Sequence, residues 1–189
     1  MEDLVEVLQR ERDLLERLRF RFVGLELVLD ALEVRYLDWA VHDVQLARHR
    51  AREADLVRAA AVGAVRLDTG DATPSLRDVA AAAPAPWAGM LRDHHDGLCA
   101  VVAEIEMHSH RIAQSCRDGL ATLARTGRLV QAAQPVGAAV GGLAAPEALA
   151  DAAPAAAADL DPLAIERMLG EVLTSTSRLR MPALLAFLR

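Results

Sequence analysis

The chain has 189 residues, of which 53% are hydrophobic and only 3% are aromatic, so any core must be built from aliphatic side chains. It contains no lysine, which excludes Schiff-base chemistry and a phosphate-loop lysine. A net charge of -6 without a strong basic cluster also argues against a nucleic-acid partner.

The N-terminal residues and the cysteines favour a cytoplasmic location. The chain opens MEDLVEVLQRERD, which is acidic and amphipathic, so we expect no secretory signal. Cys99 and Cys116 fall on one predicted helix, roughly 25 Å apart, which is too far for a disulfide. The long uncharged stretch at residues 129–146 contains glutamine, proline and glycine, so we expect no stable membrane insertion.

Apolar residues recur at alternating spacings of three and four over residues 15–39. They are Leu15, Leu18, Phe22, Leu25, Leu29, Leu32, Tyr36 and Trp39. This spacing predicts the seam of a coiled coil or of a long antiparallel hairpin, with charged residues such as Glu11 facing solvent. Because the pattern weakens after Trp39, we expect either one helix to about residue 64 or a kink near residues 38–43.

A loop and a short helix follow the seam. The stretch LDTGDATPS, residues 67–75, has the composition of a loop. Thr73 and Pro74 suit the N-cap and the first position of a helix that ends at about Ala82. The APAPW stretch then ends this helix, because a residue before proline is disfavoured in the helical conformation.

Pro84, Pro86 and Trp87 are predicted to form a structural corner. Pro86 can open a second long helix that continues to about Arg125. Trp87 then lies in the first turn of that helix, where its ring can fold over the alanine face of residues 79–83. We expect this contact to fix the angle between the short helix and the long one.

Composition divides the chain into three parts. Residues 1–126 hold the long helical patterns and form the predicted helical domain, whereas residues 127–160 are rich in alanine, glycine and proline and predict a disordered linker. Residues 161–189 contain an amphipathic pattern, with Asp161 and Pro162 as a capped helix start. The predicted fold is all-α: an elongated antiparallel helical bundle or coiled-coil hairpin, with a short helix between the long ones and a flexible C-terminal extension.

No arrangement of residues in the sequence predicts catalysis or a bound cofactor. His95 and Cys99 have the four-residue spacing of helical metal ligands, but two ligands make a weak site, so we expect no metal. His94 and His108 can instead interrupt the apolar seam as polar register residues, and the role of His110 stays open. Without a strained nucleophile turn or a phosphate loop, we predict no catalytic residue and no enzyme activity.

Four stretches follow one another in a distinctive order: RYLDWA (35–40), READLVRA (52–59), SLRDVAAAAPAPW (75–87) and LRDHHDGLCAVVAEIE (91–106). In this order they resemble the FlgN family of flagellar export chaperones, over about residues 1–125. The resemblance implies a helical bundle that binds the C-terminal segments of flagellar hook-associated proteins in the cytoplasm. It also implies delivery of these clients to the flagellar type III export apparatus. The sequence departs from the family at residues 107–111, MHSHR, where a polar stretch with asparagine is common.

We place the client-binding surface on one face of the second long helix. Its residues are Leu98, Val101, Val102, Ile105 and Ile112. This helix carries more apolar positions than one hairpin seam needs, so we expect an uncovered groove here, which an amphipathic client segment would fill. The alternative is that all five residues are simply core. We further expect residues 163–173 to cover the groove when no client is bound.

Two other interpretations stay open. A structural coiled-coil protein would oligomerise through the seam at residues 15–39 and bind no hook-associated protein. A metal or redox sensor would use His95 and Cys99, and would show zinc content or thiol reactivity. The sequence does not decide between a monomer and a homodimer, and it does not say which hook-associated protein is the client.

Overall fold

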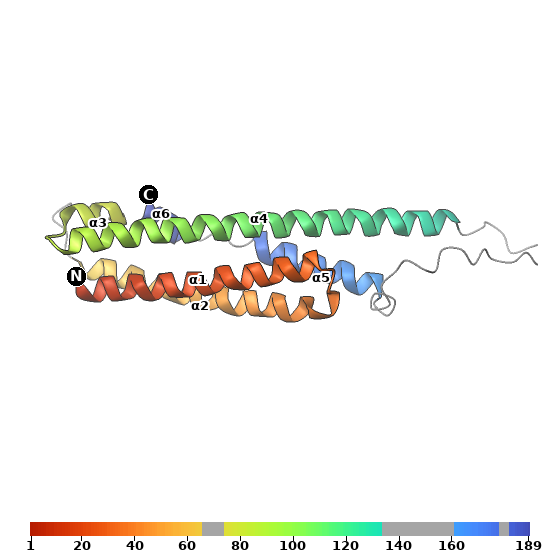
Figure 1. Cartoon of the computed structure of the whole chain (residues 1–189), viewed down its shortest axis with the longest axis horizontal. Helices are drawn as coiled ribbons and strands as arrows, with labels where there is room; N and C mark the ends of the chain where they lie inside the picture. The colour runs from red at the N-terminus through yellow and green to blue at the C-terminus, as the bar shows by residue number, and fades with distance from the viewer. Residues whose placement is uncertain (66–73, 134–160, 178–181) are drawn as a thin grey trace, which may run out of the picture.

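The computed structural model describes residues 1–65, 74–133, 161–177 and 182–189 (Figure 1). Within these ranges every regular element is a helix, and the molecule is elongated. In chain order the elements are α1 (Glu2–Asp30), the 3-10 helix η1 (Val34–Tyr36), α2 (Leu37–Ala64), α3 (Leu76–Ala82), α4 (Trp87–Ala133), α5 (Pro162–Ser177) and α6 (Pro182–Leu188). The predicted all-α, elongated helical bundle is therefore confirmed.

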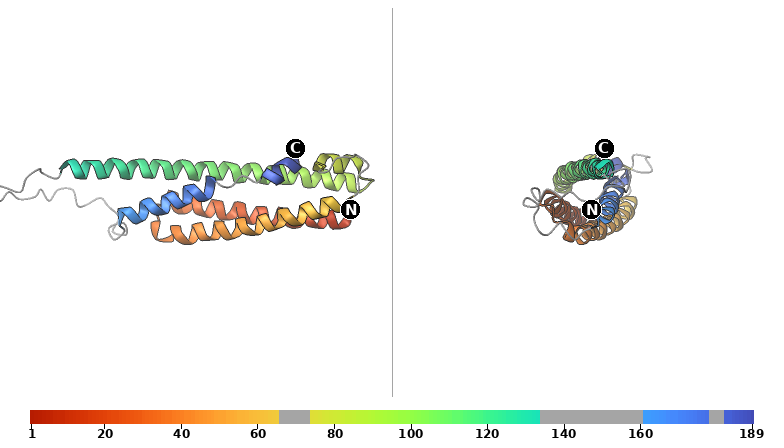
Figure 2. Two further views of the ribbon diagram at one scale, coloured as in Figure 1. Left: turned by 180° about the vertical axis from the view of Figure 1, so that it is seen from behind. Right: turned by 90° about the vertical axis from the view of Figure 1, so that its right-hand side faces the viewer.

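The long helices lie side by side along one axis (Figure 1, Figure 2). Helices α1 and α2 form an antiparallel hairpin, and α4 lies beside α1 and runs in the same direction. Helix α3 packs on the N-terminal part of α4. Helices α5 and α6 run antiparallel to α4 (Figure 2). Helix α5 also contacts α2, and α6 contacts α3, so that the C-terminal segment completes the bundle.

Polar pairs fix the register of α1 against α4. The Arg19 Nη1 atom lies 2.7 Å from Glu104 Oε2, and His108 Nδ1 lies 2.5 Å from Glu26 Oε2. The residue numbers of the paired side chains increase together in α1 and in α4, so the two helices run parallel to each other. His108 thus acts between two helices rather than on an open face, in line with the register role that its position in the seam suggested.

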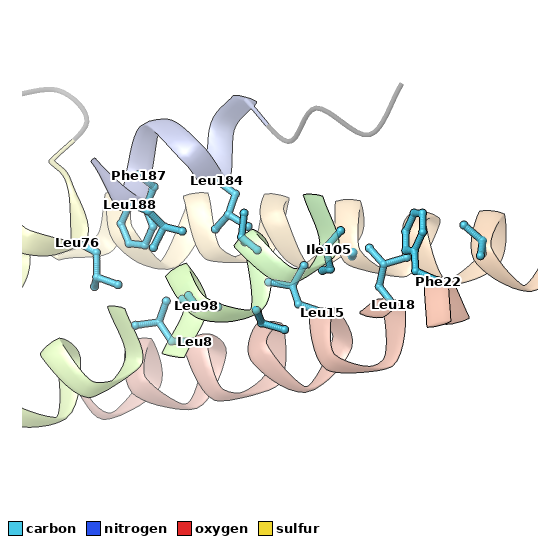
Figure 3. Packing of buried hydrophobic residues seen from close by; sticks show 14 of the residues in the cluster. Leu8, Leu15, Leu18, Phe22, Leu76, Leu98, Ile105, Leu184, Phe187 and Leu188 are labelled. Carbon is cyan, nitrogen blue, oxygen red and sulfur yellow. The ribbon is translucent and has the colours of Figure 1, made fainter. Parts of the chain in front are cut away.

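The first half of the predicted seam is buried as expected. Leu15, Leu18, Phe22 and Leu25 all lie in the core, and the same spacing extends towards the N-terminus through Leu4, Leu8 and Glu11. Figure 3 shows the side chains of several of these residues aligned between the helices. A continuous row of this kind is what a heptad pattern produces when a helix has a partner along its whole length.

The predicted seam is wrong from Leu32 onwards, whereas Leu29 packs against the core as expected. Helix α1 ends at Asp30, and the chain reverses through η1 instead of continuing or kinking later. Leu32 has a φ of 55° in this turn and is 81% exposed, while Trp39 is 70% exposed at the start of α2. Neither glycine nor proline marks the turn, so its usual sequence signal is missing: a leucine occupies the left-handed position that glycine normally fills.

Glu11 was expected to face solvent, and this expectation is also wrong. Its side chain is 1% exposed and pairs with Arg58 of α2, which is 3% exposed. Arg58 also pairs with Asp55 one turn earlier. The seam of the hairpin therefore contains one charged layer, in which Arg58 takes the inward position while the neighbouring Val57 is exposed.

The short helix and the corner lie where the sequence placed them. The N-cap of α3 is Ser75 rather than Thr73, which lies outside the described residues. Ser75 forms a capping box with Asp78, and the hydrogen bond from Ser75 lowers the pKa of the Asp78 carboxyl. Trp87 is the first residue of α4 and is half-buried. Its stacking over residues 79–83 stays a prediction.

Helix α4 is longer than predicted. It ends at Ala133 rather than near Arg125, so its last turns lie within the region assigned to a linker. Its 47 residues span about 70 Å, against about 44 Å for the 29 residues of α1. The C-terminal third of α4 therefore extends beyond the hairpin turn (Figure 1). The rest of the predicted linker, residues 134–160, lies outside the described residues.

Candidate docking slot for amphipathic helices

The five predicted client-binding residues do not form an open groove. Leu98, Val101, Val102, Ile105 and Ile112 are all buried in the hydrophobic core, none more than 4% exposed. Figure 3 shows Leu98 and Ile105 among the leucines of α1 and beside the C-terminal segment. The expectation of an uncovered stripe is thus wrong for the chain in this state, because α1 and the C-terminal helices together cover this part of α4.

The C-terminal segment contributes its apolar face to the same core. Its buried side chains are Leu169, Val172, Leu184, Phe187 and Leu188. By contrast, Leu163 at the start of α5 is 71% exposed. The amphipathic pattern predicted for residues 161–189 is therefore packed along α4 from Leu169 onwards, and Asp161 caps α5 through the backbone N–H of Leu163 as expected.

We call the surface that α5 and α6 cover the docking slot. It is lined by Gln45, Arg48 and Arg58 of α2 and by His95, Ser109 and Gly119 of α4. The directions of these contacts are consistent, since residues of α5 and α6 meet α2 in ascending order and α4 in descending order. A helix in the slot is thus parallel to α2 and antiparallel to α4.

Three polar contacts in the slot go to backbone carbonyls rather than to side chains. Arg48 Nη1 donates to the carbonyl of Ser175 over 2.6 Å, and Ser109 Oγ donates to that of Thr176 over 3.4 Å. His95 Nε2 lies 3.0 Å from the carbonyl of Leu188. All three carbonyls belong to the last turns of α5 or α6, where no helical N–H remains to bond them. The slot therefore receives the C-terminal ends of helices, and positive charge there also suits the helix dipole.

Four groups lie near the His95 ring: Asp96, Arg77, the Leu188 carbonyl and Cys99. Its Nδ1 atom is 2.9 Å from Asp96, and its Nε2 atom is near both the Leu188 carbonyl and Arg77 Nε, the latter at 3.2 Å. Arg77 can only donate to a bare Nε2, whereas the Leu188 carbonyl can only accept from a protonated one. Arg77 and Leu188 thus compete for the same nitrogen, and the tautomer of the ring decides which of the two is bonded.

An aromatic contact anchors α6 in the slot. The Arg58 guanidinium lies 4.4 Å from the centroid of the Phe187 ring. Since Arg58 also pairs with Glu11, one cation joins α1, α2 and α6. A desolvated cation–π contact of this kind contributes about 2 kcal/mol or more, so it is a substantial part of what holds α6 in the slot.

Gly119 allows α5 to approach α4 closely. A Cβ atom at this position would lie 3.2 Å from Leu169 Cδ1, tighter than ordinary van der Waals contact. Gly127, two turns further along the same helix, has no neighbour within 4 Å of the corresponding position. Gly119 therefore has α5 against it and the exposed Gly127 does not, which makes Gly127 a control position on the same helix.

A groove remains open beyond the covered part of the slot. It measures about 580 Å³ and lies between the hairpin turn and the extended part of α4. Leu29 lines it from the end of α1, Leu32 and Val34 from the turn, and Leu123 and Ile165 from α4 and α5. Sequence reasoning missed this groove because it depends on the chain reversal at Leu32, which no glycine or proline announces.

The histidine and cysteine pair does not extend into a larger cluster. Cys99 Sγ lies 3.7 Å from His95 Nε2, but no group of three or more His, Cys, Asp or Glu side chains that could hold a metal occurs in the described ranges. Burial raises the pKa of the Cys99 thiol and raises that of Cys116 to about 11. Burial and the Arg12 charge lower the pKa of His94, whose Nδ1 atom is enclosed without a hydrogen-bond partner.

Comparisons with known proteins do not indicate a function for this chain. No protein-family model matches the chain, and no curated protein or solved structure matches it either. Among the helices that the structure describes, none is both long and apolar enough to cross a lipid bilayer. The arrangement that remains to be explained is a bundle whose own C-terminal helices occupy a slot built around helix ends.

Proposed function

We propose that the protein is a cytoplasmic export chaperone that binds the C-terminal amphipathic segments of flagellar hook-associated proteins and delivers them to the flagellar type III export apparatus. The order of its motifs, from RYLDWA to the EIE stretch, resembles the FlgN family and supports this proposal. An elongated helical bundle without a group of three metal ligands in its described part is compatible with a binding role.

The observation that carries the proposal is the way the docking slot holds its own C-terminal helices. Three polar contacts reach backbone carbonyls at helix ends, and five buried apolar side chains fill the slot, besides side-chain contacts of Gln45 with Glu171 and Ser175 and of Arg58 with Phe187. The carbonyl contacts and the general apolar packing do not require the particular sequence of α5 and α6. An amphipathic helix from another protein could make the same contacts, so the slot suits a client whose exposed tail must be kept from assembling early.

In this mechanism α5 and α6 cover the slot until a client displaces them. Each fully buried Leu or Ile side chain contributes about 1.5–3 kcal/mol before the cost of ordering, so a few such anchors give binding in the micromolar range. A tethered cover acts at an effective concentration of about 1 mM, so it competes with any client of similar strength. The open groove at Leu32 and Leu123 offers an entering client its first apolar contact.

The test is client binding with and without the cover. The chain is co-expressed with the C-terminal segments of hook-associated proteins, and affinities are measured by calorimetry. Deleting residues 160–189 should tighten binding by at least about tenfold, because the client no longer competes with the tail. Leu169→Ala makes the same test in the full-length chain by weakening the cover without altering the slot, and Leu163→Ala, at an exposed position of the same helix, is its control. A client that lacks its C-terminal segment should not bind.

Other outcomes have clear meanings. Weaker binding in both cover variants, with helicity by circular dichroism retained, would show that the tail is part of the grip rather than a competitor. Absence of binding in every form would overturn the chaperone proposal. If the chain then formed stable oligomers that depend on the seam at residues 15–39, the structural coiled-coil interpretation would replace it.

A further inference from the structure

Two of the few aromatic residues of this chain are exposed side by side at the hairpin end. The only tyrosine, Tyr36, and one of the two tryptophans, Trp39, have ring centroids 5.9 Å apart, and both are exposed. Leu32 lies just before them in the same turn and is the exposed residue with a positive φ. Exposed tryptophan and tyrosine next to an exposed leucine are typical of the centre of a protein interface.

The surface beside Trp39 is acidic. A depression of about 380 Å³ is lined by three carboxylates, those of Asp38, Asp43 and of Glu171 from α5, and also by Trp39, Val41, His42 and Gln45. Arg21 neutralises Asp43 at 2.8 Å, whereas Glu171 meets only the Gln45 amide, at 3.4 Å. Within the described part of the chain, Asp38 and Glu171 have no cationic partner.

We propose that this aromatic and acidic surface, formed by Trp39, Tyr36, Asp38 and Glu171, binds an arginine-bearing segment of a partner protein. A guanidinium can stack on the exposed indole and at the same time donate to the neighbouring carboxylates, which a neutral side chain cannot do. The molecule already shows such a stack, because the Arg35 guanidinium lies 4.7 Å from the Tyr36 ring centroid. The occupant is therefore basic, with apolar residues beside the arginine to cover the leucine.

The surface also depends on the position of α5. Trp39 and Asp38 belong to α2, but Glu171 completes the depression only while α5 lies in the docking slot. A basic partner therefore binds the covered form of the protein best, and by linkage it stabilises that form. This inference does not rest on the chaperone proposal, since it concerns a different partner chemistry, although Leu32 also lines the open groove and Gln45 the docking slot.

The probe is the peptide acetyl-Leu-Arg-Ala-Ala-Arg-Leu-amide, with a control in which citrulline, the neutral isostere, replaces both arginines. The indole N–H signals of Trp39 and Trp87 are followed by NMR in the full chain. Trp39 should shift to saturation while Trp87, at the opposite corner, does not. The citrulline peptide should bind about five- to tenfold more weakly. Asp38→Asn combined with Glu171→Gln should weaken the arginine peptide similarly, whereas Glu106→Gln, an exposed acid elsewhere, should not.

Several results would overturn the inference. If the citrulline peptide bound as tightly as the arginine peptide, the partner would not need a cation. If Glu106→Gln weakened binding as much as the double variant, the attraction would come from the overall charge of the protein rather than from this surface. If sedimentation showed a dimer that Trp39→Ala converts to a monomer, the occupant would be a second copy of this chain instead. Because Trp39 is mostly exposed, its replacement should leave the fold intact, so these outcomes can be separated from unfolding.

Discussion

At the scale of single residues, burying the Glu11–Arg58 ion pair costs electrostatic free energy. Burial raises the pKa of the Glu11 carboxyl, and Arg58 opposes this rise without cancelling it. Removing one member of a buried pair leaves the other without compensation. We predict that Arg58→Ala lowers the free energy of unfolding by about 3–5 kcal/mol, measured by urea titration, whereas Arg52→Ala on the exposed side of α2 has little effect.

The loss should also depend on pH, with a definite sign. A carboxyl whose pKa is higher in the folded chain than its ordinary 4.5 adds stability below that value, and the contribution disappears as pH rises through the folded pKa. Without Arg58 the folded pKa of Glu11 rises further, so the deficit of the variant should be larger at about pH 8 than at about pH 4. A deficit that is the same at both ends would mean that Glu11 is not the group left uncompensated.

The two thiols allow a test of the sensor interpretation. With a pKa of about 11, Cys116 holds only about one thiolate in ten thousand at neutral pH, and Cys99 is shifted in the same direction. We predict slow alkylation of both by iodoacetamide in the native chain, slowest at Cys116, and fast alkylation in urea, followed by mass spectrometry. Reaction of native Cys99 faster than that of free cysteine would revive a redox role.

At the scale of elements, the sequence predicts helices that follow a repeated pattern and misses a turn that has no repeated pattern. The three-and-four spacing located α1, and Pro86 and Trp87 located the start of α4, because these patterns follow from local geometry. The reversal at Leu32 was missed because its φ is imposed by packing of the hairpin rather than by a glycine. Trp39 was therefore placed in the seam instead of on the surface.

The candidate site shows the same limit. Apolar spacing correctly selected Leu98 to Ile112 as one face of α4, but it could not say what covers that face. The cover is decided by contacts between residues far apart in sequence, such as Arg48 with Ser175 and His95 with Leu188. The polar residues that make these contacts follow no periodic pattern in the sequence, so neither contact could be predicted before the fold was known.

The close approach at Gly119 predicts a selective effect on one helix. Leucine favours helical structure more than glycine does, so Gly119→Leu should not weaken α4 itself, but its side chain needs the space that Leu169 fills. Hydrogen exchange should then become faster in α5 while α1 and α2 keep their protection. Gly127→Leu, which meets no neighbour, should leave α5 unchanged. Uniformly faster exchange in both variants would point to a general loss of stability instead.

At the scale of the whole molecule, the bundle consists of a hairpin and one very long helix, with two short helices in the remaining position. In their described residues the short helices contribute five buried apolar side chains, and their carbonyl ends are bonded by Arg48, Ser109 and His95. A core of this kind is complete only when its last layer is docked, and that layer is attached through residues 134–160 rather than through a short turn. The equilibrium between docked and undocked α5 and α6 therefore affects both the stability of the folded chain and the accessibility of the slot.

This equilibrium can be measured by cutting the chain. With a specific protease site inserted after Ala145, cleavage separates a bundle fragment from a fragment that carries α5 and α6. We predict that the two remain associated at tens of micromolar, with a dissociation constant in the range of about 1–10 μM, because the buried anchors must still offset the entropy of association. Size-exclusion chromatography and calorimetry provide the measurement.

The cut chain also distinguishes a cover from a permanent core. An exchangeable cover should be replaced by an excess of a labelled fragment of residues 146–189 within the lifetime set by its dissociation, and Gly119→Leu should shorten that lifetime. Complete separation of the fragments at tens of micromolar would show that α5 and α6 are not docked to a useful extent. Exchange that occurs only when the whole bundle unfolds would show that the slot never opens, and a client could then not use it.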